Sequence, residues 1–248
     1  MTRIPLGPVQ LDITDVSAVE RAAEGYISRR QPSHIVTLNA LMYNLTLNDP
    51  ELAAAVSRAA LIVPDSVGMV WAARFIHGVR SPRLTGIDLI DRFCGHAARS
   101  NYRLFLLGAA PGVAEETGRR LAQRFPGLTI AGTRDGYFTH EEETAVIDAV
   151  VKARPHFLFV ALAMPHQEKW IHRHLNSLGV PVVMGVGGSF DVISGRLRRA
   201  PRWMQRCGIE WFFRLLQQPS RIFRMKDLPL FVWNMIKLKA AIASRKDL

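Results

Sequence analysis

The chain has 248 residues, of which 48% are hydrophobic, and this suits one large domain or one domain with an appendage. No apolar run reaches the length of about 18 residues that spans a bilayer, and the first residues lack the apolar core of a signal peptide, so we expect neither a transmembrane nor a secreted protein. The formal net charge is +11, and residues 196–248 carry thirteen Lys and Arg against three Asp and Glu. A basic segment of this kind attracts the phosphate groups of nucleic acids, anionic lipids or small ligands.

Short apolar runs alternate with amphipathic stretches along most of the chain. The apolar runs lie at residues 34–38, 60–63, 102–108, 128–133, 156–162 and 181–188. Most of them are continuously apolar, which is typical of strands that are covered on both faces. Helical stretches lie between them, and one begins with an Asp-Pro start signal at residues 49–50. The alternation predicts an α/β, Rossmann-like fold with a mainly parallel sheet flanked by helices.

Polar and glycine-rich residues follow several of the predicted strands. They are Thr37 and Asn39, Asp65, and the stretches 108–112, 134–138, 163–170 and 185–191. Because parallel strands end at the same edge of a sheet, we expect these residues to line one edge. Ligands of such sheets bind outside the carboxyl ends of the strands. The sequence therefore predicts a site at this edge.

The two glycine-rich stretches match neither the dinucleotide fingerprint nor the phosphate loop that ends in Gly-Lys-Ser/Thr. We interpret GAAPG (108–112) as a tight strand-to-helix turn. GVGGS (185–189) leaves two interpretations open, because its adjacent Gly187 and Gly188 exceed what a turn requires. One is a turn, and the other is a loop whose backbone N–H groups approach a phosphate.

Asp65 is a lone carboxylate directly after a buried strand, so it either caps the next helix or takes part in chemistry. Ser66 could serve as the cap instead, which would free the carboxylate. The histidines show no ligand pattern, and Cys94 and Cys207 lie far apart, so we predict no metal site. The chain also lacks the Asp-x-Asp pair that many nucleotide-sugar enzymes use to hold a divalent metal, which leaves helix N-termini or arginines to meet a diphosphate.

Residues 196–248 are predicted to form a basic, amphipathic helical appendage to a domain of residues 1–195. The appendage contains Trp203, Trp211 and Trp233, three of the five tryptophans, interleaved with arginines. Basic residues beside Trp and Phe, on helices too short to span, favour a segment that lies in a membrane interface. A helical hairpin packed on the body with a solvated basic face is the second interpretation. A nucleic-acid surface ranks last, because no nucleic-acid-binding motif accompanies it.

Seven stretches of the chain closely resemble the WecG/TagA/CpsF family of bacterial glycosyltransferases. They run in order from about Thr37 to Arg224, and they read TLNALMYN, VPDSVGMVWAARF, RLTGIDL, LFLLGAAPGVAE, GTRDGYF, ALAMPHQEKWI and GVGGSFDVISGRLRRAPRWMQRCGIEWFFRLLQQPSR. The resemblance implies an inverting enzyme that moves N-acetylmannosamine, its uronic acid or glucose from a UDP-sugar to a polyprenyl-diphosphate-linked acceptor. Such products feed bacterial surface polysaccharide or teichoic acid.

The resemblance also implies roles for individual residues. Asp65 matches the proposed general base, which takes the proton from the acceptor hydroxyl, and Thr37 and Asn39 match residues that contact the sugar or position the acceptor. The residues that it implies for substrate binding are Arg83, Asp88, Gln167, Gly187, Gly188, Arg214, Arg221 and Arg224. The three last arginines would meet the diphosphate, so neither a metal nor a resident cofactor is expected.

The family's appendage is thought to dock on the membrane and close over the active site, which implies a cytoplasmic protein bound peripherally to the inner face of the bacterial plasma membrane. A nicotinamide-dependent oxidoreductase is an alternative that the fold permits, but the chain lacks GxGxxG and a matching acidic residue. A non-catalytic membrane adaptor is another. The sequence leaves open the donor sugar, the acceptor and whether the appendage docks on a neighbouring subunit in a homo-oligomer.

Overall fold

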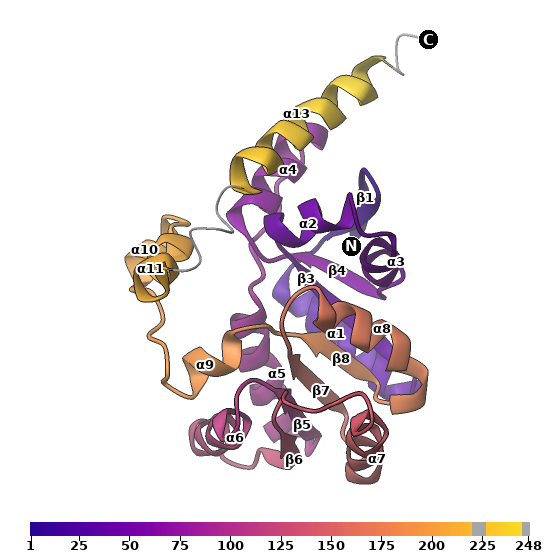
Figure 1. Cartoon of the computed structure of the whole chain (residues 1–248), viewed down its shortest axis with the longest axis vertical. Coiled ribbons are helices and arrows are strands. Elements are labelled where there is room, and N and C mark those ends of the chain that lie inside the picture. Colours follow the sequence, from indigo (N-terminus) through magenta and orange to yellow (C-terminus); the bar gives the residue numbers. More distant parts are fainter. Residues whose placement is uncertain (220–226, 245–248) are drawn as a thin grey trace.

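The computed structural model of the chain describes residues 1–219 and 227–244 (Figure 1). Its strands are β1 (Thr2–Leu6), β2 (Val9–Ile13), β3 (Ser33–Leu38), β4 (Leu61–Pro64), β5 (Arg103–Gly108), β6 (Thr129–Arg134), β7 (Phe157–Ala161) and β8 (Val182–Gly185). Its helices are α1 (Val16–Ser28), α2 (Ala40–Thr46), α3 (Pro50–Ser57), α4 (Val67–His77), α5 (Gly86–Ser100), α6 (Val113–Arg124), α7 (Glu143–Ala153), α8 (His166–Leu178), α9 (Ser189–Ile193), α10 (Arg202–Arg206), α11 (Glu210–Gln217) and α13 (Asp227–Ser244).

Six strands form one sheet in the order β4-β3-β8-β7-β5-β6, and every neighbouring pair is parallel. These are the six strands that the apolar runs predict, so the α/β, Rossmann-like fold is confirmed. All residues of β3, β4, β7 and β8 are buried, because helices cover both faces of the sheet. The carboxyl ends of the strands therefore share one edge, as expected.

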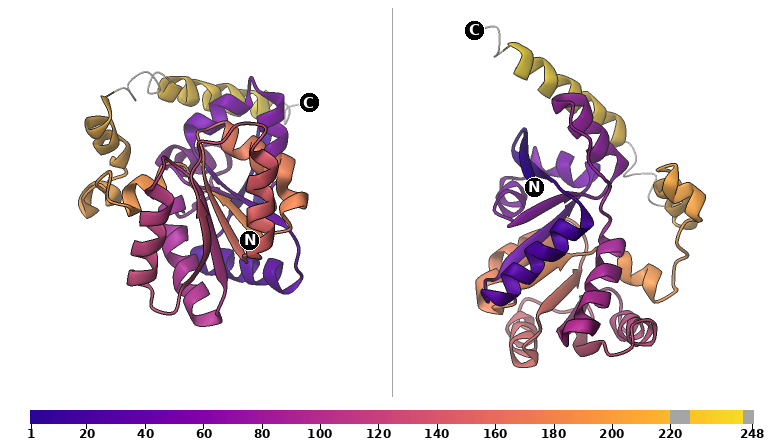
Figure 2. Two further views of the ribbon diagram at one scale, coloured as in Figure 1. Left: turned by 60° about the horizontal axis from the view of Figure 1, so that its bottom comes forward. Right: turned by 180° about the vertical axis from the view of Figure 1, so that it is seen from behind.

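Helices form a layer on each face of the sheet (Figure 2). Alternate strand residues pack against one layer or the other. On one face, residues such as Ile35 and Phe157 pack with α1, α5 and α6. On the other face, Leu158 and Val183 pack with α7 and α8, whereas Val36 and Ile62 pack with α2, α3 and α4. This layering places the N-termini of α2, α4 and α5 above the carboxyl ends of β3 and β4.

The N-terminal hairpin of β1 and β2 was not predicted from the sequence. The two strands pair antiparallel, and each is only five residues long. The buried Asp12 carboxylate accepts a hydrogen bond from the Ile62 N–H at 2.8 Å and two from the Arg3 guanidinium. The hairpin thus satisfies a backbone donor of β4, the edge strand of the sheet.

The helix α13 lies along α2 and α4 (Figures 1 and 2). Its Phe231 and Met235 are buried, and the Phe231 ring meets that of Tyr43 edge to face with centroids 5.5 Å apart. Asn44 Nδ2 donates to the Asp227 carbonyl at 2.6 Å, which anchors the start of the helix. Within the described ranges, no helix has the length and apolarity to cross a bilayer. The predicted boundary after residue 195 falls in the loop that follows α9, and the division into two domains stays a prediction.

Candidate active site

Asp65 lies where β3 and β4 end. Its N–H donates to the Leu38 carbonyl at 2.9 Å, which continues the pairing of the two strands by one residue. The next residue, Ser66, caps α4, since its Oγ accepts from the Met69 N–H at 3.3 Å, and it also accepts from the Ala40 N–H at 3.2 Å. The two alternatives for Asp65 are thereby resolved at α4: the cap is Ser66, and the carboxylate is free for another role.

The Asp65 carboxylate is half-buried and points to the start of α5. Its Oδ1 accepts from the Gly86 N–H at 3.1 Å, and its Oδ2 has no hydrogen-bond partner among the described residues. Burial raises the pKa of Asp65 to about 6; the Gly86 N–H and the charges of Arg214 and Arg83 oppose this rise, and Glu210 adds to it. A carboxylate with such a pKa is ionised at neutral pH and still accepts a proton readily, which suits a general base.

Thr37 and Asn39 flank the same strand ends. Thr37 Oγ1 donates to the Gly185 carbonyl at 3.2 Å, so this hydroxyl joins β3 to β8. A Cβ atom on Gly86 would lie 3.6 Å from it, which places the hydroxyl beside the residue that binds Asp65. Asn39 caps α2 with its Oδ1, which accepts from the N–H groups of Leu41 and Met42. Its amide Nδ2 has no partner in the part of the chain that the structure describes, so it is available to a ligand.

Gln167 connects α8 to the loop after β8. Its Oε1 accepts from the Gly187 N–H at 2.9 Å, and its Nε2 donates to Glu168 Oε1 at 2.8 Å. Glu168 Oε2 lies 2.8 Å from His34 Nε2, an ion-pair contact outside hydrogen-bond geometry, and all three side chains are buried. The loop that contains Gly187 and Gly188 thus rests on a buried chain of polar groups. Gly187 has a φ of +48°, which favours glycine.

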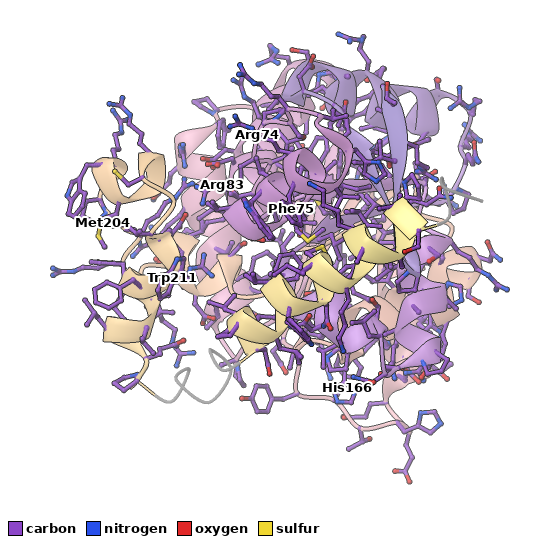
Figure 3. The ribbon with its side chains drawn as sticks, turned by 90° about the horizontal axis from the view of Figure 1, so that it is seen from above. Arg74, Phe75, Arg83, His166, Met204 and Trp211 are labelled. Atoms are coloured by element: carbon purple, nitrogen blue, oxygen red, sulfur yellow. The ribbon has the colours of Figure 1, made fainter. Side chains whose placement is uncertain are left out.

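Arg83, Asp88 and Arg214 gather around the C-terminal segment. Arg83 Nη2 lies 3.4 Å from both the Gln205 carbonyl and Glu210 Oε2, and Figure 3 shows Arg83 between the body and the α10–α11 segment that contains Met204 and Trp211. Arg214 pairs with Glu210 at 4.0 Å. Asp88 accepts from Thr85 Oγ1 at 2.6 Å and pairs with Arg199 at 2.5 Å. Arg221 and Arg224, also predicted to bind the substrate, lie outside the described residues.

No motif of the sequence pointed to His34, Glu168, Arg199 or Glu210. Their partners lie up to 134 residues away along the chain, as for the His34–Glu168 pair, so no local spacing reveals them. One signal in the sequence indicates that Glu168 is buried. It follows Gln167 in a helix whose apolar face also carries Trp170 and Ile171. A charged residue on such a face requires a partner inside the fold.

A cavity of about 390 Å³ lies beside α5 and includes Arg83 and Asp88 in its lining, but not Asp65 or Thr37. It also contains Asp91 and Arg124, which pair with each other through two hydrogen bonds of 2.8 and 2.9 Å. We place the candidate active site at the strand ends, because the half-buried Asp65 carboxylate lies there and its Oδ2 has no hydrogen-bond partner among the described residues. Among the described residues, no group of three or more His, Cys, Asp or Glu is placed to hold a metal ion.

The chain is similar to known glycosyltransferases along most of its length. The sequence model of the WecG/TagA/CpsF family of glycosyl transferases matches residues 4–245. An N-acetylglucosaminyldiphosphoundecaprenol N-acetyl-β-D-mannosaminyltransferase of Bacillus spizizenii is 36% identical over 237 residues, which cover 94% of this chain and 91% of that protein. Proteins of the same name are 34% identical in Bacillus subtilis (89% and 86% covered) and in Staphylococcus aureus strain MW2 (86% and 83% covered).

Proposed function

Since the chain belongs to the WecG/TagA/CpsF family of glycosyltransferases, we propose that it transfers a sugar, with inversion, from a UDP-sugar to a polyprenyl-diphosphate-linked acceptor. The names of the relatives support N-acetylmannosamine as the sugar and an acceptor that ends in N-acetylglucosamine. Its uronic acid and glucose are the other donors to test. The product would enter a bacterial surface polysaccharide or teichoic acid. Family membership also favours this function over an oxidoreductase or a non-catalytic adaptor.

Asp65 is the general base of the proposed reaction. The acceptor hydroxyl attacks the anomeric carbon, the bond from that carbon to UDP breaks, and the proton of the hydroxyl passes to Asp65. A single displacement inverts the anomeric carbon, so no second carboxylate is needed as a nucleophile. The observation that carries this assignment is the half-buried carboxylate at the strand ends, held by one N–H and left with an open oxygen. Thr37 and Asn39 lie beside it to orient the sugar or the acceptor.

The departing UDP requires positive charge. Arg83 and Arg214 lie close enough to Asp65 to lower its pKa, and they are the guanidinium groups of the described chain that we assign to the diphosphate. Arg221 and Arg224 are proposed to join them. Asp88 acts at a distance, because it holds Arg199. Gln167 fixes the loop of Gly187 and Gly188, which we propose lies against the nucleotide. Because arginines supply the charge, the proposal needs neither a metal nor a resident cofactor.

A panel of UDP-sugars tests this function. We expect the purified chain to release UDP from UDP-N-acetylmannosamine, and to do so rapidly only when a lipid-diphosphate N-acetylglucosamine acceptor is present. Added EDTA is expected to leave the rate unchanged. A rate that EDTA abolishes and Mg²⁺ restores would contradict the role given to the arginines. Failure to release UDP from any of UDP-N-acetylmannosamine, its uronic acid, UDP-glucose and UDP-glucuronic acid would contradict the function itself.

We further propose that the C-terminal helices dock on the anionic inner face of the bacterial plasma membrane. Figure 3 shows α13 across the body with the α10–α11 segment beside it. Large apolar side chains of both are exposed: Trp203, Trp211, Phe212, Leu216, Leu230, Val232, Trp233 and Ile236. Lys237 lies over the Trp233 ring at 5.3 Å, so cationic and aromatic groups share one face. This composition suits the headgroup region of a membrane.

Vesicle binding tests the docking surface. We expect the chain to co-sediment with vesicles that contain phosphatidylglycerol, and less so with pure phosphatidylcholine. Trp211→Glu and Trp233→Glu should each weaken the binding by about tenfold, since burial of a large apolar side chain is worth roughly 1.5–3 kcal/mol. Val151→Glu, a matched change of an exposed apolar residue on α7, should have no effect. Equal losses in all three variants would contradict a localised surface.

A further inference from the structure

Glu210 is the only residue of α11 that is buried, although it is charged. Three arginines surround its carboxylate within the described residues: Arg83 at 3.4 Å, Arg199 at 3.9 Å and Arg214 at 4.0 Å. The carboxylate of Glu210 thus faces three positive charges, of which only Arg199 has a second carboxylate partner, Asp88, among the described residues. Guanidinium groups this close repel one another unless an anion lies between them. The carboxylate of Glu210 is therefore the anion that Arg83 and Arg214 share.

The arginines come from different parts of the chain. Arg83 precedes α5 in the body, whereas Arg199 lies in the loop after α9 and Arg214 lies on α11, one turn beyond Glu210. Arg83 also donates to the Gln205 carbonyl, and Arg199 also pairs with Asp88 of α5. Glu210 is hence one of the points at which the C-terminal segment is tied to the body, together with the Arg83–Gln205 and Arg199–Asp88 contacts. That point is close to Asp65, since Arg83, Arg214 and Glu210 all act on that carboxylate.

We propose that Glu210 is a positioning residue that holds Arg83 and Arg214 beside Asp65. The role rests on the proposed function, because it is the catalytic carboxylate and the leaving diphosphate that these arginines serve. Without the carboxylate of Glu210, the guanidinium groups of Arg83 and Arg214 repel one another and turn to solvent. Of its polar contacts with Arg83 among the described residues, the α10–α11 segment then keeps only the long one of the Gln205 carbonyl, at 3.4 Å. The carboxylate of Glu210 is paired with arginines and is not available to bind substrate. Its effect on the reaction therefore passes through these arginines.

The charges around Asp65 make the proposal testable, because it predicts whether the pKa of Asp65 rises or falls when Glu210 is neutralised. The charged groups that act on Asp65 are Arg214 and Glu210 from α11 and Arg83 from the segment before α5. Each arginine lowers the pKa of Asp65 more than Glu210 raises it. If the arginines stay when Glu210 is neutralised, the pKa of Asp65 falls. If they leave, as we propose, their larger effects are lost and the pKa of Asp65 rises above about 6.

The experiment is a ¹³C NMR titration of the aspartate carboxyl groups, with the Asp65 resonance assigned by its absence in Asp65→Asn. We expect the pKa of Asp65 to rise in Glu210→Gln and to stay at its wild-type value in Glu116→Gln. Glu116 is a matched control, because it also binds two arginines, Arg119 and Arg120, but lies on α6 and does not act on Asp65. An unchanged or lower pKa of Asp65 in Glu210→Gln would overturn the proposal.

A second variant and a second readout keep the test decisive. Glu210→Asp retains the charge but draws it away from the arginines, so we expect a smaller rise of the same sign, and a fall would overturn the proposal even if Glu210→Gln does not fold. In turnover assays, kcat of Glu210→Gln should drop about tenfold or more, a part of the roughly 10²–10⁴ that general-base assistance supplies. The NMR result does not require turnover. If the pKa rises but Asp65→Asn keeps full activity, the positioning holds and the assignment of Asp65 as the base fails.

Discussion

Replacement of Asp65 by Asn is expected to lower kcat by about 10²–10⁴, the usual contribution of a general base. The two side chains have the same shape, and the amide oxygen of Asn still accepts the hydrogen bond from the Gly86 N–H. The variant should therefore keep its fold and its affinity for the donor while it loses the group that takes the proton. Steady-state rates at saturating donor and acceptor, together with the circular dichroism spectrum, measure both parts of this expectation.

The matched control for this variant is Asp91→Asn. Asp91 also has a pKa raised by burial, but it lies in the middle of α5 and is bound by Arg124. We expect Asp91→Asn to retain the wild-type kcat. If both variants lose activity alike, the loss reflects a general effect on buried carboxylates. If Asp65→Asn turns over at the wild-type rate, another group accepts the proton and the assignment of Asp65 is wrong.

Replacement of His34 by Leu is expected to lower the free energy of unfolding by about 3–5 kcal/mol, the usual cost of removing one partner of a buried pair. Glu168 Oε2 has no polar partner other than His34 within the described ranges, so the variant leaves this buried oxygen without one, and only Oε1 keeps its hydrogen bond from Gln167. Because Glu168 also holds the amide of Gln167, the loop of Gly187 should loosen as well. Urea denaturation followed by fluorescence measures the loss of stability.

A second histidine–glutamate pair provides the control. His96 lies 2.7 Å from Glu24, and both side chains are partly exposed. A pair of this kind is typically worth about 0–1 kcal/mol, so His96→Leu should be nearly neutral. Losses of similar size in the two variants would show that burial of the His34–Glu168 pair does not set its contribution to stability.

The sheet could be predicted from the sequence because its signal is local. Each of the six strands is a short, mostly apolar run. A strand that is covered on both faces can be recognised from such a run alone, without knowledge of the strands with which it pairs. The common edge of Thr37, Asp65 and the loop after β8 followed from the parallel order alone. The β1–β2 hairpin was missed, since each strand is only five residues long and Pro5 lies within the first, while Gly7 and Pro8 form the turn between them.

The charged clusters of the site could not be predicted in the same way. Glu210 reaches Arg83 across 127 residues, and its burial depends on how α11 meets the body, which no periodicity encodes. The sequence left Asp65 with two roles, and only the hydrogen bonds of Ser66 show which residue caps α4. The two interpretations of the C-terminal appendage, a membrane-interface segment and helices packed on the body, are compatible on α13. Phe231 and Met235 are buried against the body, while Trp233 and Ile236 are exposed. Docking of the outward face on a membrane stays a prediction.

The pH dependence of kcat/KM tests the role of Asp65 most directly, because it reports ionisations of the free enzyme. A base must be deprotonated to act, so activity should fall as the pH drops through the pKa of Asp65, at about 6. We expect this acid limb in the wild-type chain and in Asp91→Asn, and no such limb in the residual activity of Asp65→Asn. An acid limb that persists near pH 6 in Asp65→Asn would contradict the assignment of Asp65 as the base.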